Sequence, residues 1–451
     1  MLFLLFFGII LYHLSDSMST TKIKDLKKMN IIESPKNFEE IELEIIKRKI
    51  EEGRKEFEIF LQSAANNEPP IGVGGNRLIH IRHINMDIET SLGKVKINVL
   101  CGQNKLTGKW ETPFRNRFFR GEHSAMSPAL EQKIVTTVCE TGSFEKAAIV
   151  SKAWGYNLTD DKAMSTIRKV GEACSLSKLT TYCDFAARQD DILVIMMDGW
   201  MARYRENLWG KPNAEHEERV AWHEVKSGVI FRLSEVAEVN KNRRLIITKH
   251  IVAMPAETSP VDFGRKMQDE AERMGMNRAK KVYVIMDGGV YLWGVFEDRF
   301  ANIAVGQLDY YHASQHLHAL AEAIFPLEAQ KDEKTKWLNR LLKNLKTWGP
   351  KTLMEAIAIA ETKKIEEEER QKTFKRESSY FKDHENHMNY RSAKADGVPI
   401  GSGAMESQCA QNQNRFKRRG QFWSKRGFAL FLEAYVWYSN NELKYLYRPA
   451  I

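Results

Sequence analysis

Two segments with the composition of buried strands each end in an aspartate followed by glycine. Residues 192–197 are continuously apolar and lead into Asp198, and residues 281–286 lead into Asp287. An acidic side chain at the end of a buried strand is costly unless it is paired or bound to a cation, and ligands of open α/β sheets collect at the carboxyl ends of the strands. Either Asp-Gly alone is explained as a strand-end turn. Both together, in a basic chain, favour a shared site for a hard divalent cation.

A third carboxylate could complete this site. Glu406 follows the glycine-rich segment 400–403. We expect Ser402 to cap a helix that begins there, which would place Glu406 in the first helical turn. The helix dipole alone also favours a glutamate at that position. If the carboxylates of Asp198, Asp287 and Glu406 converge, they would hold two Mg²⁺ or Mn²⁺ ions across a phosphodiester.

A basic and aromatic segment lies near the end of the chain. Residues 415–426 combine six cations with three aromatic side chains and contain no acid. Cations neutralise phosphates, and aromatic rings can stack on unpaired bases near a cut DNA end. A solvated helix face is the alternative, although such faces usually carry acids as well. The residues that we expect to contact DNA, including two arginines that follow Asp198, are Arg203, Arg205, Arg415, Lys417, Arg418, Arg419, Trp423, Lys425 and Arg426.

Composition is consistent with a polyanionic partner. The chain has 451 residues, a formal net charge of +9, and 28% charged and 43% hydrophobic residues. This length allows roughly two to four domains, and the basic balance favours DNA or RNA as partner. The five cysteines contain no CxxC pair. We therefore expect neither a structural zinc site nor a disulfide framework, and a reducing cytoplasm fits.

The elements that must position the carboxylates follow from hydrophobic spacing. Within residues 186–310, strand-like segments and one helix alternate, which supports a mixed α/β fold. The order of three strands, a helix, a strand and further units is the one expected of an RNase H-like core. The predicted strands are 192–197, 220–233, 245–254, 281–286 and 303–308, and the predicted helix is 261–276.

Other regions surround this core. We expect an N-terminal helix and a small strand-rich region over 18–126, and three short helices over 127–185. The three helices fit a helix-turn-helix-like DNA-binding region, and an ordinary helical bundle is the alternative. Residues 311–396 read as helix throughout and form an insertion, after which 397–451 return to the core with Glu406 and the basic segment.

The first residues stand apart from the rest. Residues 1–17 begin with an apolar run that lacks a basic n-region and a clear cleavage site, and that is short for a bilayer span. Met18 opens a polar stretch, so we expect translation to start there and the leader not to belong to the native protein. A membrane anchor is the alternative. No later segment is a transmembrane candidate, so no membrane partner is expected.

One more acidic residue ends a short apolar segment. Asp309 follows residues 303–308, and His312 stands three positions later. From the residues alone, Asp309 could itself be the second metal ligand in place of Asp287. His312 could equally be an ordinary histidine on a helix.

Together these features resemble bacterial insertion-sequence transposases of the Mutator-like DDE class, from about residue 127 to the end. Those proteins carry a helical insertion between their second and third acids, and an Asp or Cys, two residues, then His shortly after the second acid. A cysteine-pair zinc element that they can carry is absent here. The matching positions are the triad Asp198, Asp287 and Glu406, the pair Asp309 and His312, and the segments 222–228 and 400–406.

The resemblance implies both roles and activity. It favours Asp287 over Asp309 as the second metal ligand, and makes Asp309 and His312 accessory residues that position DNA or a neighbouring carboxylate. It implies a cytoplasmic, nucleoid-associated bacterial transposase that cuts and joins the inverted-repeat ends of its element to target DNA, as a dimer or larger assembly, with no small-molecule substrate. The alternatives are an RNase H-like nuclease without strand transfer and a domesticated sequence-specific DNA-binding protein.

Overall fold

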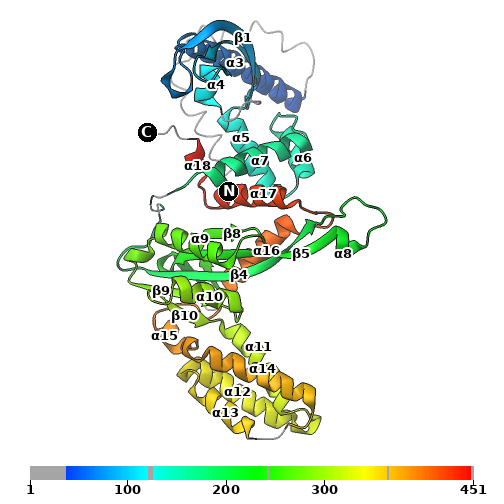
Figure 1. The fold of residues 1–451 in the computed structure, drawn as a ribbon, viewed down its shortest axis with the longest axis vertical. Helices are drawn as coiled ribbons and strands as arrows, with labels where there is room; N and C mark the ends of the chain where they lie inside the picture. The colour runs from blue at the N-terminus through cyan, green and yellow to red at the C-terminus, as the bar shows by residue number, and fades with distance from the viewer. Residues whose placement is uncertain are drawn as a thin grey trace. The chain divides into compact units, whose positions relative to one another are not determined.

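The computed structural model describes residues 37–119, 125–179, 181, 183, 185–240, 243–362 and 365–447. The chain divides into two compact units, Met1–Ser127 and Pro128–Ile451, whose elements are labelled in Figure 1. This division falls one residue after the boundary predicted at 126. The predicted leader at 1–17, and the part of the predicted first helix before residue 37, lie outside the described residues.

The N-terminal unit is a long helix packed on a β-hairpin. In its core, Leu61 and Ala65 of α3 are buried together with Val95, Ile97 and Val99 of β2. The predicted helix is confirmed over its described part, and the predicted strand-rich segment forms the hairpin β1–β2. The elements are α3 (Phe38–Asn66), η1 (Val73–Gly75), β1 (Leu78–Thr90), β2 (Gly93–Asn104), β3 (Trp110–Glu111) and α4 (Pro113–Phe118).

Three short helices open the second unit, as predicted: α5 (Pro128–Thr141), α6 (Phe144–Ala153) and α7 (Asp160–Leu176). Ser143 and Thr159 cap α6 and α7 by accepting backbone N–H hydrogen bonds. The helices do not close a core by themselves, because α17 (Lys425–Ser439) packs along α7. A Cβ on Gly171 would lie only 2.0 Å from the carbonyl oxygen of Leu430. The predicted helical region is thus completed by the C-terminal part of the chain.

A five-stranded mixed sheet forms the centre of the second unit, in the order β10-β9-β4-β5-β8. Strands β4, β9 and β10 run parallel, and β5 is antiparallel to both of its neighbours. The mixed α/β class predicted from the sequence is confirmed. The strands are β4 (Ile192–Arg205), β5 (Val220–Arg232), β8 (His250–Met254), β9 (Lys281–Met286) and β10 (Val305–Leu308).

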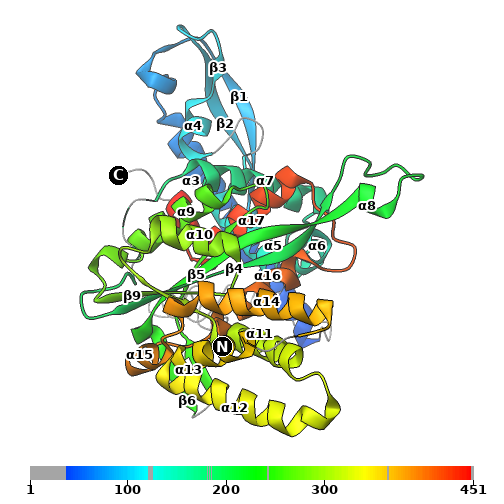
Figure 2. The same cartoon turned by 60° about the horizontal axis from the view of Figure 1, so that its bottom comes forward.

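Two predicted strands had wrong boundaries. The first does not end at Asp198: β4 continues to Arg205 because residues 199–205 stay paired with 220–226 of β5. The two strands thereby form an arm that carries α8 (His216–Arg219) near its end (Figure 2).

The single strand predicted at 245–254 is also wrong, because strand β7 (Arg243–Ile246) ends there and a new strand begins at His250. There the Ile247 N–H donates to the Glu235 carbonyl oxygen, and β7 pairs with β6 (Val236–Asn240) in a separate hairpin. Only β8 joins the main sheet.

Helices cover both faces of the sheet. On one face, the odd-numbered residues of 193–197 pack against α9 (Pro260–Arg273) and α10 (Val290–Arg299). On the other, the rings of Trp200 and Tyr204 contact Phe428 of α17. Because successive strand residues point to opposite faces, Asp198 belongs to the face of Trp200.

The segment predicted as a helical insertion forms a stack of separate helices, which Figure 1 shows below the sheet. Leu341, Leu345, Ile357 and Phe381 are buried among them. The helices are α11 (Tyr310–Ile324), α12 (Lys331–Trp348), α13 (Lys351–Glu361), α14 (Glu368–Asp383) and α15 (Tyr390–Ala395). They are followed by α16 (Gly403–Phe416), α17 and α18 (Leu443–Leu446), and short 3-10 helices are η2 (Leu233–Glu235), η3 (Met276–Arg278), η4 (Glu328–Gln330) and η5 (Glu385–His387). Within the described ranges, no helix has the length and apolar character needed to cross a bilayer.

Candidate metal and DNA site

Asp198 and Asp287 are neighbours across the two central parallel strands. Met197 of β4 pairs with Met286 of β9, so the next residue on each strand is an aspartate. Adjacent strands lie about 4.8 Å apart. Both aspartates also fall on the same face, since Met197 and Met286 are buried together on the opposite one. The sequence prediction that these two carboxylates meet is supported by this register.

The carboxylate of Asp198 is poorly compensated. Burial raises its pKa, and the nearby charge of Asp287 raises it further, to about 6, although the Gly199 N–H and His312 favour the ionised form. Among the described residues, its hydrogen-bond donors are the Gly199 N–H at 2.7 Å and the Cys409 thiol at 3.7 Å. A half-buried carboxylate with so few donors is one that a divalent cation would stabilise.

Asp287 is held in a tight turn. One carboxylate oxygen accepts the Gly289 N–H at 2.9 Å, and the Asp287 carbonyl oxygen accepts the indole N–H of Trp293 at 2.8 Å. A Cβ on Gly288 would lie 2.1 Å from the ring of Tyr380. Glycine at this position therefore lets the turn approach α14 closely.

Substituting this glycine tests the approach. We expect Gly288→Ala to cost about 1–3 kcal/mol in unfolding free energy, because the new methyl group overlaps the ring of Tyr380. Denaturant unfolding measures the loss. In the double variant with Tyr380→Ala, most of the added loss should disappear, and equal losses from Gly288→Ala in both backgrounds would contradict the packing.

Glu406 approaches the same region from α16. It is exposed and stands one helical turn before the buried Cys409, so the two share a helix face. Burial raises the pKa of the Cys409 thiol, and the charges of Asp198 and Glu406 raise it further. Cys409 thus lies near both carboxylates. Among the described residues, only one group of three possible metal ligands has its ligand atoms all within 4.8 Å of one another, and that group lies elsewhere. The carboxylate oxygens of Asp198, Asp287 and Glu406 therefore do not all meet this limit.

Asp309 is fully occupied by hydrogen bonds. Its side chain is buried, and one oxygen accepts the N–H groups of Tyr311 at 2.5 Å and His312 at 3.0 Å. The other oxygen accepts the Ser402 N–H at 2.5 Å and the Ser402 hydroxyl. Ser402 stands at the N-cap of α16 as predicted, but its hydroxyl bonds to Asp309 and not to the helix, so the predicted capping bond is wrong.

The contacts of Asp309 fix the start of the helix that carries Glu406. The Tyr310 N–H donates to the Ile400 carbonyl oxygen at 3.0 Å. A Cβ on Gly401 would lie 2.5 Å from the Tyr311 ring. Asp309 therefore has no free lone pair suited to a metal ion, and it anchors the segment before Glu406. His312, half-buried on α11, favours the ionised form of Asp198.

The sequence pattern of the uncharacterised protein family UPF0236 matches residues 83–445. The chain belongs to this family. No curated protein matches it. The match extends from β1 to α18 and contains every candidate residue of the site.

Several predicted DNA contacts of this UPF0236 chain lie together on the β4–β5 arm. The guanidinium of Arg203 lies 5.5 Å from the ring centre of Trp222, and the amine of Lys417 lies 4.6 Å from the same ring. We call this set the arm surface: Arg203, Arg205, Trp209, Trp222, Lys417 and Phe422. The rings of Trp209 and Trp222 are 41% and 50% exposed, so they can accept a further stacking partner.

Other predicted contacts hold the UPF0236 fold together. Arg415 donates to the carbonyl oxygens of Cys139 and Glu140 at the end of α5. The indole N–H of Trp423 donates to the Phe416 carbonyl oxygen at 2.8 Å, and the ring packs among aromatic residues of α17.

The remaining predicted DNA contacts differ in whether they already have a partner within the protein. Arg418 donates to the Asn414 carbonyl oxygen at 2.8 Å, and Arg426 lies 3.5 Å from Glu172. Arg419 and Lys425 are exposed and make no ion pair with another described residue.

Sequence reasoning missed four side chains near the aspartates. Burial raises the pKa of Tyr291, and the charges of Glu224, Asp198 and Asp287 raise it further. Lys226, beside Glu224 on β5, is buried with its amine 5.8 Å from the Tyr291 ring. The helical spacing from Glu406 would have indicated the fourth, Cys409, and Tyr291 stands four residues after Asp287 on α10, whereas Glu224 and Lys226 depend on strand pairing.

Proposed function

We propose that this protein is a DNA transposase of the RNase H-like DDE class, with Asp198, Asp287 and Glu406 as its metal-binding triad. The observation that carries the proposal is the register of β4 and β9, which sets Asp198 beside Asp287 on the face covered by α16. The chain order of three strands, α9, β9, α10 and β10 is also the order expected of an RNase H-like core. A helical stack separates the second and third acids, as in the transposases that the sequence resembles.

The residues present fit a divalent cation. Asp198 and Asp287 offer hard oxygen ligands at a half-buried position, and burial together with the charge of Asp287 raises the pKa of Asp198, so a bound cation would stabilise its ionised form. Glu406 would add its carboxylate from α16. Two bound Mg²⁺ or Mn²⁺ ions would supply activation of the attacking hydroxyl and stabilisation of the leaving oxygen.

The chain's own residues position these groups and the DNA. Asp309 holds Ser402, and through it the helix that carries Glu406. Phosphoryl transfer needs mainly positioning and charge neutralisation, so a rigid start of α16 matters to the reaction. The arm surface provides three cations and exposed aromatic rings next to the end of β4, on which phosphates and unpaired bases can be held.

The arm surface yields a prediction of its own. We expect Trp222→Ala to weaken binding of a DNA end with a single-stranded overhang by about 10- to 100-fold, since base–aromatic stacking contributes about 1–3 kcal/mol per base. Fluorescence anisotropy with labelled DNA measures the affinity. Trp348→Ala is the matched control, because Trp348 is 67% exposed and has Arg391 over its ring at 5.3 Å, but lies on α12. Equal losses in both variants would contradict a specific role for the arm.

Product analysis tests the proposed activity and separates it from its nuclease alternative. The protein is incubated with Mg²⁺, a target plasmid and DNA carrying the inverted repeats that flank its gene. A transposase releases 3′-hydroxyl ends and joins them to the plasmid. Cutting without joining would assign the nuclease activity, and specific binding without cutting would assign the domesticated DNA-binding role.

A further inference from the structure

A second cluster of possible metal ligands lies away from the carboxylate triad. Cys183, His250 and Glu442 each offer one ligand atom, and these atoms lie within 4.8 Å of one another. They come from the segment between α7 and β4, from the edge strand β8, and from the segment between α17 and α18. Three parts of the second unit that are far apart in sequence therefore meet at this point.

Backbone hydrogen bonds hold the cysteine in place. The Cys183 N–H donates to the Arg273 carbonyl oxygen at 3.0 Å, and the Ala187 N–H donates to the Met274 carbonyl oxygen at 2.7 Å. The cysteine is thus fastened to the end of α9, beside β8. A fixed position for the thiol is what a metal site needs.

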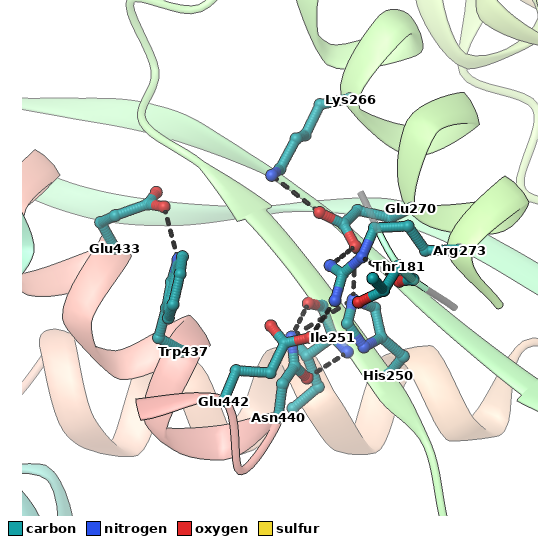
Figure 3. A network of polar contacts seen from close by, with 10 residues as sticks. All are labelled: Thr181, His250, Ile251, Lys266, Glu270, Arg273, Glu433, Trp437, Asn440 and Glu442. Atoms are coloured by element: carbon teal, nitrogen blue, oxygen red, sulfur yellow. Dashed lines mark hydrogen bonds and ion pairs between the residues drawn. The ribbon is translucent and has the colours of Figure 1, made fainter. Parts of the chain in front are cut away.

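His250 has the environment of a metal-binding histidine. Its side chain is buried, and Nε2 lies 2.9 Å from a carboxylate oxygen of Glu270 (Figure 3). The other ring nitrogen, Nδ1, is buried and has no hydrogen-bond partner among the described residues. Metal-binding histidines commonly donate one N–H to a carboxylate, which orients the ring and leaves the second nitrogen for the ion. An unpaired buried nitrogen is otherwise costly.

The surrounding charges would balance a divalent ion. Glu442 accepts a hydrogen bond from Arg273 at 2.5 Å through one oxygen, and its other oxygen accepts none from the described side chains. In Figure 3 the network contains the three carboxylates of Glu270, Glu433 and Glu442 but only two permanent cations, Lys266 and Arg273. Counted formally and with His250 neutral, as metal binding requires, one negative charge is left over, and a cysteine thiolate would add a second.

The site is reachable from solvent. Two of the three ligands, His250 and Glu442, line a cavity of about 600 Å³ together with Cys174, Glu270 and Arg273. It provides an entry path for an ion and room for water as a further ligand.

We infer that Cys183, His250 and Glu442 form a zinc site that fastens the segment between α7 and β4 to the edge of the sheet. Sulfur, nitrogen and oxygen donors together suit Zn²⁺, which binds three protein ligands and leaves a fourth position for water. The sequence alone predicts no zinc site, because the cysteines lack paired spacing. This site would escape such a search, since its ligands are drawn from three distant segments.

Cobalt substitution tests the site. Protein freed of metal with a chelator and titrated with one equivalent of Co²⁺ should develop a thiolate-to-cobalt charge-transfer band and the strong visible absorption of tetrahedral Co²⁺. One equivalent of Zn²⁺ should remove both. Cys183→Ser should lose the charge-transfer band, and Glu442→Gln should weaken Co²⁺ binding at least tenfold. A band that persists in Cys183→Ser, or no band in the wild-type protein, would overturn the assignment.

Two further variants locate the ion. Cys174→Ser is the matched control, because Cys174 lines the same cavity but is not among the three ligands. It should keep the band. Asp198→Asn should also keep it, since the triad is a separate site, whereas loss of the band in either variant would contradict the proposal. A stabilising shift in melting temperature on adding Zn²⁺, present in Cys174→Ser and absent in Cys183→Ser, is expected from ligand linkage.

Discussion

Asp198→Asn is expected to abolish DNA cleavage while leaving the metal-free protein at least as stable as the wild type. The loss of activity should be about 10³-fold or more, because the residues of a catalytic unit fail together when one is removed. The free energy of unfolding should stay the same or rise, because the substitution removes an ionised carboxylate that lies half-buried beside Asp287. Few single variants would combine these two results unless the residue serves a bound cation.

The pH dependence of stability follows from the raised pKa of Asp198. Its pKa is about 6 in the folded protein against an ordinary value of 3.8 for an aspartate, so the unfolded chain releases this proton at lower pH. The contribution of Asp198 to stability therefore falls as the pH rises from about 4 to about 6. Above pH 6 the folded protein carries the full cost of the half-buried negative charge. A difference of about two between these pKa values corresponds to at most roughly 3 kcal/mol.

Urea unfolding in EDTA measures this effect. Asp198→Asn should be more stable than wild type at pH 8, and the difference should shrink towards pH 4. Asp298→Asn is the control, because it removes the charge of an aspartate on α10 whose side chain is 58% exposed. Adding Mg²⁺ or Mn²⁺ at pH 8 should stabilise the wild type only. A variant that is less stable than wild type at pH 8 in EDTA would contradict the electrostatic account of this residue.

Asp309→Asn is expected to act in the reverse manner, by destabilising the fold. The buried carboxylate accepts four hydrogen bonds, and an asparagine cannot accept on its amide nitrogen. Buried donors left without an acceptor cost about 1–3 kcal/mol each, so we expect a loss of roughly 2–5 kcal/mol in unfolding free energy. Cleavage should fall as well, because the start of α16 loosens.

Comparison with Asp287→Asn decides which aspartate holds metal. Asp287→Asn should keep its stability in EDTA but lose stabilisation by Mn²⁺, whereas Asp309→Asn should lose stability and still respond to Mn²⁺. Differential scanning fluorimetry with and without Mn²⁺ measures both. If Asp309→Asn proves as stable as wild type and fails to bind Mn²⁺, Asp309 is the second ligand and the assignment of Asp287 is wrong.

The parts of the site that depend on strand ends could be predicted from the sequence. Residues 192–197 and 282–286 are apolar and continuous, and each segment is followed directly by aspartate. Parallel pairing of two such strands sets Asp198 and Asp287 side by side without further information. The helix that carries Glu406 was predictable from a local signal as well, since Ser402 stands at its N-cap position.

Features that depend on distant partners were not predictable. Asp198-Gly199 has the composition of a turn, yet β4 continues because residues 220–226 pair with its second half. The hydroxyl of Ser402 bonds to Asp309, 93 residues away, and not to its own helix. Trp423 has the appearance of an exposed stacking residue, but its ring packs on α17. In each case a long-range contact outweighs the local preference that the sequence displays.

Fe²⁺-directed cleavage of the protein backbone tests the convergence of the triad most directly. Fe²⁺ substituted for Mg²⁺ generates hydroxyl radicals that cut the chain close to the bound ion, and mass spectrometry identifies the cut positions. We predict cuts around residues 198, 287 and 406 in the wild type, all suppressed by excess Mg²⁺ and absent from Asp198→Asn. Cuts confined to one of these segments, or clustered around His250 alone, would contradict a shared site for the three carboxylates.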